Sequence, residues 1–158
     1  MSINVIRWNK QKIKLIGMQE LEILNKKLRM RATCSGVCQK EYHYIITVYV
    51  VGRPVTEAIS FKYSQSDGPS MSREDYWRSL SMLAMNAAQT EISYEQFASR
   101  WVGRRTEQEI RAAYQECQND LEKVRFLFPD IDTPWKLHLA VCEILDDDKT
   151  SMEFRYGD

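Results

Sequence analysis

The middle of the chain alternates between apolar and polar positions in the manner of β-strands. Residues 42–51 form the strongest such run, and after a Gly-Arg-Pro break at residues 52–54 a second alternating run covers residues 55–63. Two runs joined by a short loop of turn residues predict a β-hairpin. Since both faces of residues 42–51 carry apolar or aromatic side chains, we expect this strand to be central and covered on both sides. A further alternating run at residues 28–34, ending before a Ser-Gly turn, predicts a third strand.

The stretch before residue 28 follows a different spacing. Leu21, Leu24 and Leu28 recur three and four positions apart, which predicts a short helix over residues 20–28. Residues 13–16 fit the end of a strand or of that helix equally well. We therefore interpret the first 27 residues as an arm or helix whose arrangement stays open.

The second half of the chain carries helix start signals followed by apolar stripes. Residues 72–75, 93–96 and 106–109 each begin with Ser or Thr and end with an acidic or amide residue, as capping boxes do. Thr-Pro at residues 133–134 starts a last helix, because proline is accepted at the first helical position. Together with the hairpin, these signals predict an α+β fold in which a three-stranded antiparallel sheet packs against a C-terminal helical bundle.

Length and composition favour a single domain over residues 1–158. A chain of 158 residues with 44% hydrophobic residues is close to the common size of one compact core. Within it we assign residues 1–27 to a basic N-terminal arm or helix, 28–65 to the sheet, 72–145 to the helices and 146–158 to an acidic tail.

The large apolar residues of the predicted strands and helices define the expected core. Trp101 and Trp135 are expected to be structural as well, whereas a Trp that faces solvent at either position would mark an interface anchor. The predicted core comprises Ile46, Val48, Phe61, Leu80, Leu83, Phe97, Tyr114, Leu121 and Leu137.

Nothing in the sequence indicates a membrane or an export route. The longest apolar run is far shorter than the roughly 20 residues of a membrane-spanning helix, and the N-terminus lacks a secretory core. Without a secretion signal, the four cysteines are better interpreted as reduced thiols than as disulfides. We expect a cytoplasmic protein with no membrane partner.

The cysteines and histidines, which could bind a metal, do not occur in the matched pairs that a structural metal site needs. Cys34, Cys38 and His43 are spaced somewhat like zinc ligands, but a structural zinc site needs a second matched pair. Only Cys117 and Cys142 could supply it, and both lie on apolar helix stripes. Core thiols are therefore the preferred interpretation.

Catalytic motifs are equally hard to find. His43 lies in the strongest strand and His138 in the last helix, so neither histidine occupies a glycine-rich loop of the kind that exposes a nucleophile. The six glycines are scattered singly, which does not match a phosphate loop or a dinucleotide fingerprint. We expect no cofactor, no metal and no enzymatic activity.

Charge is distributed unevenly, although the formal net charge is zero. Residues 1–40 hold nine Lys or Arg against two Glu, and residues 41–158 hold thirteen against twenty. Such asymmetry fits a nucleic-acid contact, an acidic interaction surface, or two faces that pair with each other. Lysines at alternating positions also fit the solvent side of an edge strand, where they prevent aggregation. The candidate nucleic-acid contacts are Arg7, Lys10, Lys12, Lys14, Lys26 and Lys27.

A cluster of carboxylates follows the apolar stripe of the last helix. Carboxylates can occupy sites meant for phosphates, so these residues are candidate contacts for a positively charged groove of a partner protein. The alternative is a solvated acidic tail. The four candidates are Glu143, Asp146, Asp147 and Asp148.

A series of aromatic, small and basic residues runs from the end of the hairpin to the end of the longest predicted helix. It includes an aromatic-Glu-x-aromatic-small segment and a long helix with a central cysteine and a basic, aromatic end. Over residues 42–128 this series resembles small, uncharacterised proteins carried by phages, prophages and mobile elements. The chain departs from them at residues 102–105. This segment is short and basic, whereas those proteins usually have an aspartate-containing loop there. The matching residues are Tyr63, Tyr94, Glu95, Phe97, Ala98, Trp101, Gly103, Ala112, Tyr114, Cys117, Leu121, Lys123 and Phe128.

The resemblance implies a genomic setting more than a chemistry. Accessory proteins of phages and mobile elements often act stoichiometrically on host machinery, including restriction and CRISPR defence. It therefore implies a non-enzymatic inhibitor, of anti-CRISPR or anti-restriction type, that binds a host protein or ribonucleoprotein complex in the cytoplasm of a bacterial host. The alternative is a DNA- or RNA-binding accessory protein that uses the basic arm.

Overall fold

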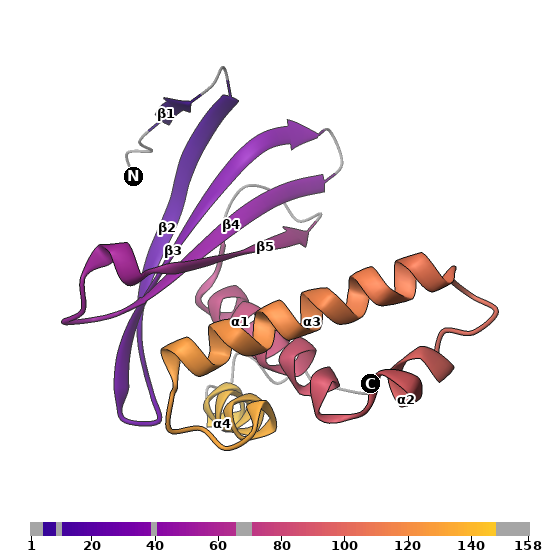
Figure 1. Cartoon of the computed structure of the whole chain (residues 1–158). Coiled ribbons are helices and arrows are strands. Elements are labelled where there is room, and N and C mark those ends of the chain that lie inside the picture. Colours follow the sequence, from indigo (N-terminus) through magenta and orange to yellow (C-terminus); the bar gives the residue numbers. More distant parts are fainter. Residues whose placement is uncertain (1–4, 9–10, 39–40, 66–70, 148–158) are drawn as a thin grey trace. The chain divides into compact units, whose positions relative to one another are not determined.

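The chain forms two compact units (Figure 1). The units, Met1–Ser79 and Leu80–Asp158, meet inside one helix, and each is described here by itself. The assignment of the whole chain to a single domain stays a prediction. The computed structural model describes residues 5–8, 11–38, 41–65 and 71–147, with side chains over residues 15–34, 42–64 and 71–146.

The first unit holds a five-stranded sheet in which every strand is antiparallel to its neighbours. The strands lie in the sheet in chain order, as Figure 1 shows. The α+β class and the antiparallel sheet are confirmed, but the predicted number of three strands is wrong, because the residues before 28 also form strands. Packing of the sheet against the helical bundle stays a prediction. The strands are β1 (Val5–Trp8), β2 (Gln11–Ile23), β3 (Lys26–Cys38), β4 (Glu41–Val50) and β5 (Ile59–Gln65).

The helix predicted over residues 20–28 is instead the tip of the hairpin between β2 and β3. Leu24 and Asn25 both have positive φ, 50° and 65°, as a two-residue turn that matches the twist of the strands requires. The turn brings Leu21 directly opposite Leu28, and both are buried. Their spacing of seven residues, which suggested a helical stripe, therefore reflects pairing across a hairpin.

The strand predicted from residue 55 begins later. Val55–Glu57 form a short 3-10 helix, η1, whose last residue, Glu57, accepts a hydrogen bond at Oε2 from Nε of Arg53 at 2.8 Å. β5 starts only at Ile59. Pro54 precedes η1, and a proline cannot donate to the ladder of a sheet. The alternation of apolar residues thus begins at residue 55, before strand geometry begins at Ile59.

One face of the sheet is buried and the other is polar. Tyr44, Ile46 and Val48 of β4 are fully buried, whereas the alternate positions of the same strand are half-buried. β4 lies between β3 and β5 and so has a neighbour on each side, but the central strand of the sheet is β3, and the second face of β4 is only half-buried. Val51 follows the end of β4 and is exposed. The inner face also includes Leu21, Ile23, Leu28, Met30, Ala32 and Cys34.

Helix α1 (Arg73–Ala88) begins with the predicted capping box and crosses the boundary between the units. The backbone N–H of Asp75 donates to Ser72 Oγ at 3.3 Å, and the N–H of Ser72 donates to Asp75 Oδ2 at 3.0 Å. These two bonds satisfy donors that a helix start leaves without intrahelical partners. Tyr76 and Trp77 in the next turn are buried.

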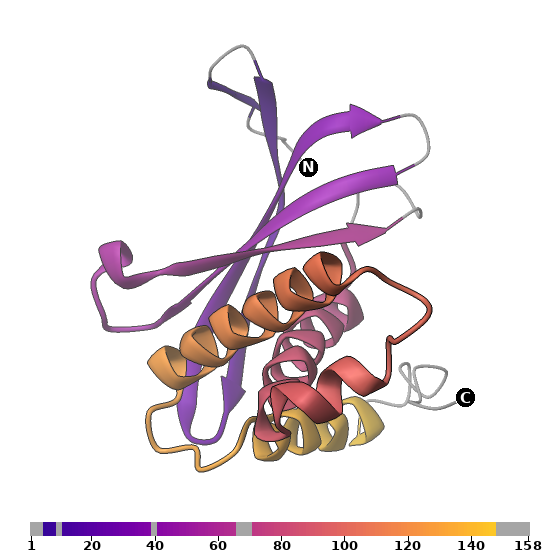
Figure 2. The ribbon, with the colours of Figure 1, turned by 45° about the vertical axis from the view of Figure 1, so that its right-hand side comes forward.

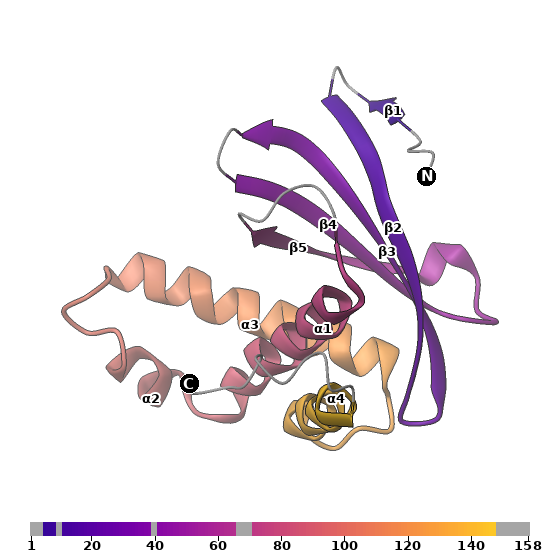
Figure 3. The ribbon, with the colours of Figure 1, turned by 180° about the vertical axis from the view of Figure 1, so that it is seen from behind.

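The second unit consists of the rest of α1 and three further helices (Figures 2 and 3). Reciprocal hydrogen bonds confirm the capping boxes that start at Ser93 and Thr106. α2 lies beside the N-terminal part of α3, where Phe97 packs with Ile110 and Cys117. The elements are the 3-10 helix η2 (Gln89–Glu91) and the helices α2 (Tyr94–Ser99), α3 (Glu107–Leu127) and α4 (Pro134–Asp147).

The predicted core is confirmed at most positions. Phe61, Tyr114 and Leu121 are half-buried rather than buried. The hydroxyl of Tyr114 donates to the carbonyl of Ile92 at 3.2 Å. The confirmed core residues are Ile46, Val48, Leu80, Leu83, Phe97 and Leu137.

Candidate functional site

The candidate acidic contacts lie on α4 or directly after it. Glu143 and Asp146 are exposed on the C-terminal half of the helix. Asp147 is the last residue of α4, but its side chain lies outside the described residues, as does all of Asp148. Two of the four predicted carboxylates therefore have a defined position.

These two carboxylates share one helix face with two large apolar residues. Trp135 is 45% exposed and Leu139 is 54% exposed. Positions 135, 139, 143 and 146 are four, four and three residues apart, a spacing that places them on one side of an α-helix. We call these residues, Trp135, Leu139, Glu143 and Asp146, the α4 face.

The amphipathic sequence of α4 explains why this face points outward. Leu137, Val141 and Leu145 repeat every four residues on the opposite side and are buried. Burying three aliphatic side chains stabilises the fold by several kcal/mol, at roughly 1.5–3 kcal/mol each, so the helix cannot rotate to hide Trp135. The expectation that Trp135 is structural is therefore wrong, and its exposure fits the alternative of an interface anchor.

The indole of Trp135 is held in a defined orientation. Its ring stacks on the imidazole of His138 with the centroids 4.9 Å apart and the planes 14° from parallel. The neighbouring Lys136 is paired with Asp132 at 2.7 Å. The α4 face thus combines an ordered aromatic group, an aliphatic group and two carboxylates, and none of its four residues is basic.

The candidate basic contacts divide between two ends of β2. Arg7 is the cross-strand partner of Lys12, and Lys14 pairs with Val5. Lys26 instead pairs with Ile23 at the far end of the strand, about 35 Å from Lys12 at 3.3 Å per residue. Lys27 follows Lys26 in β3, and Lys10 lies outside the described residues.

This division changes the edge-strand interpretation of the lysines. β2 lies between β1 and β3, but β1 pairs only with Gln11 to Lys14. Lys14 pairs with Val5 of β1 and with Cys34 of β3, so it lies in the part of β2 that has strands on both sides, whereas Lys12 pairs with Arg7 of β1. Among the described positions, the basic residues at the two ends of β2 do not form one continuous patch.

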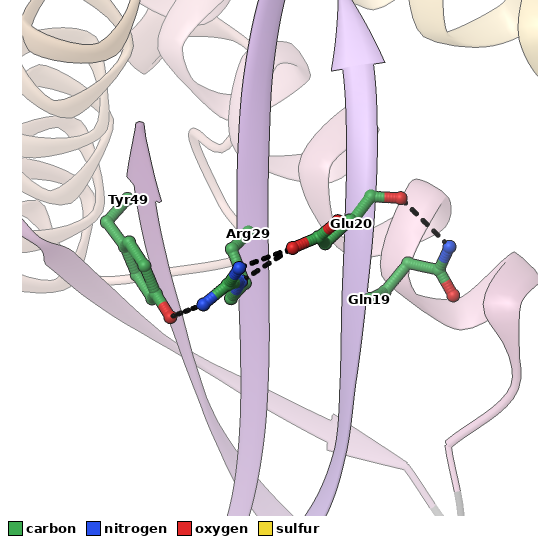
Figure 4. Close-up of polar contacts among 4 residues, drawn as sticks. All are labelled: Gln19, Glu20, Arg29 and Tyr49. Carbon is green, nitrogen blue, oxygen red and sulfur yellow. Dashed lines mark hydrogen bonds and ion pairs between the residues drawn. The ribbon is translucent and has the colours of Figure 1, made fainter. Parts of the chain in front are cut away.

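Basic residues on the polar face of the sheet are engaged with neighbouring strands (Figure 4). Arg29 of β3 donates through Nε to Glu20 of β2 at 3.0 Å and through Nη1 to the hydroxyl of Tyr49 of β4 at 3.4 Å. Its Nη2 makes a second contact with the same carboxylate. These bonds, chiefly the one with Glu20, raise the pKa of Arg29 above its already high value. The network links three strands of the sheet. Because the guanidinium is permanently charged, Arg29 does not take part in proton transfer.

The cysteines differ in their surroundings. Cys34 and Cys117 are buried, as expected of core thiols, and burial raises the pKa of Cys117 to about 11 with help from Asp120 and Glu116. Cys142 is half-buried, and its Sγ lies 3.7 Å from Nε2 of His138. Sequence reasoning missed this pair, although a spacing of four residues on one helix could have revealed it.

The zinc-like spacing of Cys34, Cys38 and His43 has no counterpart in the described structure. His43 Nδ1 lies 3.1 Å from Ser64 Oγ on the neighbouring strand, and the side chain of Cys38 lies outside the described residues. Over the described part of the chain, no three potential metal ligands cluster. Among the same residues, no helix is both long and apolar enough to cross a membrane.

Comparison with known proteins adds no relative. No family profile, no curated protein and no solved structure matches the chain.

Proposed function

We propose that this protein is a non-enzymatic inhibitor, carried by a phage or mobile element, that binds a nucleic-acid-handling defence complex in the cytoplasm of its bacterial host. The observation that carries the proposal is the α4 face, on which an exposed Trp and Leu stand beside two carboxylates. An inhibitor of this kind needs a surface rather than an active site.

The composition of the α4 face suits a partner that normally binds phosphates. Aromatic residues are favoured anchors of protein interfaces, and Trp135 pre-ordered by stacking loses little conformational freedom on binding. Glu143 and Asp146 supply charge complementary to a basic groove, which steers association and excludes other partners. The sequence extends this negative charge through Asp147 and Asp148.

A nuclease inhibition assay tests the proposal. DNA cleavage by purified CRISPR effector and restriction complexes from candidate hosts is measured with increasing amounts of the protein. We expect stoichiometric inhibition of one complex, relieved by the double substitution Glu143→Lys and Asp146→Lys and by Trp135→Ala. Glu122→Lys is the matched control, because Glu122 is exposed on α3 and lies outside the α4 face. Inhibition that survives both α4 changes would remove this surface from the proposal.

The second candidate function is DNA or RNA binding by the β1–β2 hairpin. It is favoured by the register that sets Arg7 opposite Lys12, with Lys14 two residues further along the same strand. Three cations within two short strand segments can neutralise neighbouring phosphates, and such binding weakens steeply with salt.

Fluorescence anisotropy with labelled single- and double-stranded DNA and RNA at about 50 mM salt tests this second function. Lys12→Glu with Lys14→Glu should abolish binding, whereas Lys26→Glu with Lys27→Glu should leave it, since Lys26 and Lys27 lie at the other end of β2. The absence of binding by the unmodified protein would exclude it.

A further inference from the structure

A thiol, an imidazole and a hydroxyl form a connected series inside the second unit. His138 of α4 is 4% exposed. Its Nδ1 lies 2.8 Å from Oγ of Ser81 in α1, and its Nε2 lies 3.7 Å from Sγ of Cys142 one turn further along α4. The latter distance is within the range of a hydrogen bond to sulfur. Nucleophilic cysteines generally have this arrangement of a thiol, a base and a group that orients the base.

The role of His138 as a base depends on a ring proton at Nδ1, on the side of Ser81. Burial lowers the pKa of His138, so the ring is neutral near pH 7, and a bond with the backbone of Ser81 raises that pKa in part. A backbone group that raises an imidazole pKa is a carbonyl, which accepts a hydrogen bond from a ring N–H. In the tautomer with Nδ1–H directed at Ser81, Nε2 presents its lone pair to Cys142 and can accept the thiol proton.

Two further contacts prepare the imidazole for this role. Trp135 stacks on the ring at 4.9 Å, which fixes its plane together with Ser81. An indole face also stabilises a cation, and therefore the imidazolium that forms when the ring accepts a proton.

Access distinguishes Cys142 from the other described thiols. Cys142 is half-buried and borders the exposed side of α4, whereas Cys34 and Cys117 are buried. Among the described side chains, no histidine contacts Cys117, whose neighbours Asp120 and Glu116 disfavour a thiolate. Among the cysteines with described side chains, Cys142 alone combines partial exposure with an adjacent imidazole.

We propose that Cys142 is a site of reversible oxidation by hydroperoxides, with His138 as its general base and Ser81 as the residue that positions the base. The sulfur attacks one oxygen of the peroxide while its proton passes to Nε2 of His138. The S–O bond forms, the O–O bond breaks, and the leaving oxygen takes the proton from the imidazolium to depart as water or an alcohol. The sulfur is oxidised by two electrons to a sulfenic acid, and the peroxide is reduced. A first thiol then condenses with the sulfenic acid to give a mixed disulfide and water, and a second thiol releases reduced Cys142 by forming a disulfide with the first.

Oxidation at this position would also alter the α4 face, a consequence that rests on the proposed function. Cys142 is adjacent to Glu143 and three residues from Leu139, so a polar oxygen would be added at the margin of that face. Peroxide reactivity itself needs no partner, and it can therefore be tested even if the α4 face binds nothing.

The experiment follows each cysteine of the folded, fully reduced chain. The protein is treated with hydrogen peroxide, the sulfenic acid is trapped with dimedone, and labelling of each cysteine is measured by peptide mass spectrometry. We expect Cys142 to react at least about tenfold faster than Cys117, and all cysteines to react at similar rates in urea. Equal reactivity of Cys142 and Cys117 in the folded protein would overturn the proposal.

The pH dependence separates base assistance from simple exposure. In the unmodified protein the rate at Cys142 should change little between pH 6.5 and 8, because neutral His138 is already the proton acceptor. In His138→Gln the rate should fall about 100-fold at neutral pH and then rise about tenfold per pH unit, as for an unassisted thiol. Ser81→Ala should lower the rate less and keep the flat profile. If His138→Gln does not fold, the pH profiles of the wild-type protein and of Ser81→Ala still test the role of His138. A wild-type oxidation rate that rises tenfold per pH unit would contradict that role.

Discussion

The hydroxyl of Tyr76 lies so close to Gly17 that a side chain at position 17 would have no room. A Cβ placed on Gly17 would be 2.9 Å from the Tyr76 oxygen. Gly17 stands at the irregularity in the pairing of β2 with β3, opposite Ala32 on the buried face of the sheet. Burial raises the pKa of Tyr76 to about 12, which the backbone of Ala32 offsets only in part, and the hydroxyl has no hydrogen-bond partner of normal geometry among the described residues.

This contact predicts that Gly17→Ala destabilises the protein. The added methyl group must displace a buried ring or the strand, which typically costs about 1–3 kcal/mol. Urea unfolding of Gly17→Ala measures the cost directly.

Tyr76→Phe provides the matched control. Because the hydroxyl is buried without a partner, its removal should be neutral or stabilise the fold by up to about 1 kcal/mol. Removal also makes space for the methyl group, so Gly17→Ala should cost less in the Tyr76→Phe background than alone. Strictly additive effects would show that the hydroxyl is not what excludes a side chain from position 17.

The exposed and buried sides of α4 predict opposite responses to truncation. Leu137→Ala removes a fully buried side chain and should cost about 2–5 kcal/mol. Trp135→Ala, two residues earlier, should cost less than about 1 kcal/mol, because the indole is 45% exposed and loses mainly its stacking on His138. A large loss of stability in Trp135→Ala would mean that the indole is part of the core and would weaken its assignment as an anchor.

The surroundings of Asp120 lead us to predict that the folded protein loses part of its stability as the pH rises. Burial raises the pKa of Asp120, while Lys123 and a hydrogen bond with Asn86 lower it in part. Because the pKa in the folded state exceeds the ordinary value of 3.8, the folded protein binds this proton more tightly than the unfolded chain does. The contribution to stability is fully present below pH 3.8 and is lost as the pH rises through the folded pKa.

Asp120→Asn should remove this pH dependence and raise the stability at pH 7. Thermal unfolding between pH 4 and 7 measures how the stability of each variant depends on pH. Glu122→Gln is the control, since Glu122 is exposed on the same helix. A steeper decline of stability with pH in Asp120→Asn than in the unmodified protein would reverse the assigned sign.

Features that depend on neighbouring residues were predictable from the sequence. The capping boxes at Ser93 and Thr106 form as expected, because the bonding partners are three residues apart. The start of α4 at Pro134 follows from the same kind of local rule. Local signals thus located the helices well.

Features that depend on distant residues were not predictable in this way. Ser81 and His138 are 57 positions apart, so their contact depends on how α1 packs against α4. The exposure of Trp135 is likewise decided by packing, because Trp is compatible with either side of an amphipathic helix. The hairpin around Leu24 was missed because Leu-Asn is not among the usual turn pairs such as Asn-Gly.

That unusual turn leads to a last prediction, that Leu24→Asn stabilises the protein. Leu24 has φ of 50°, a left-handed conformation that costs most side chains roughly 1–2 kcal/mol and Asn less. Its side chain is 44% exposed, so little buried surface is lost on replacement. We expect a gain of about 0.5–1 kcal/mol in urea unfolding, larger when Asn25→Gly completes an Asn-Gly turn. Leu21→Asn is the control, because Leu21 is buried opposite Leu28 and its replacement should destabilise strongly. If Leu24→Asn instead lowers stability, the exposed leucine must make apolar contacts that outweigh the strain of its backbone.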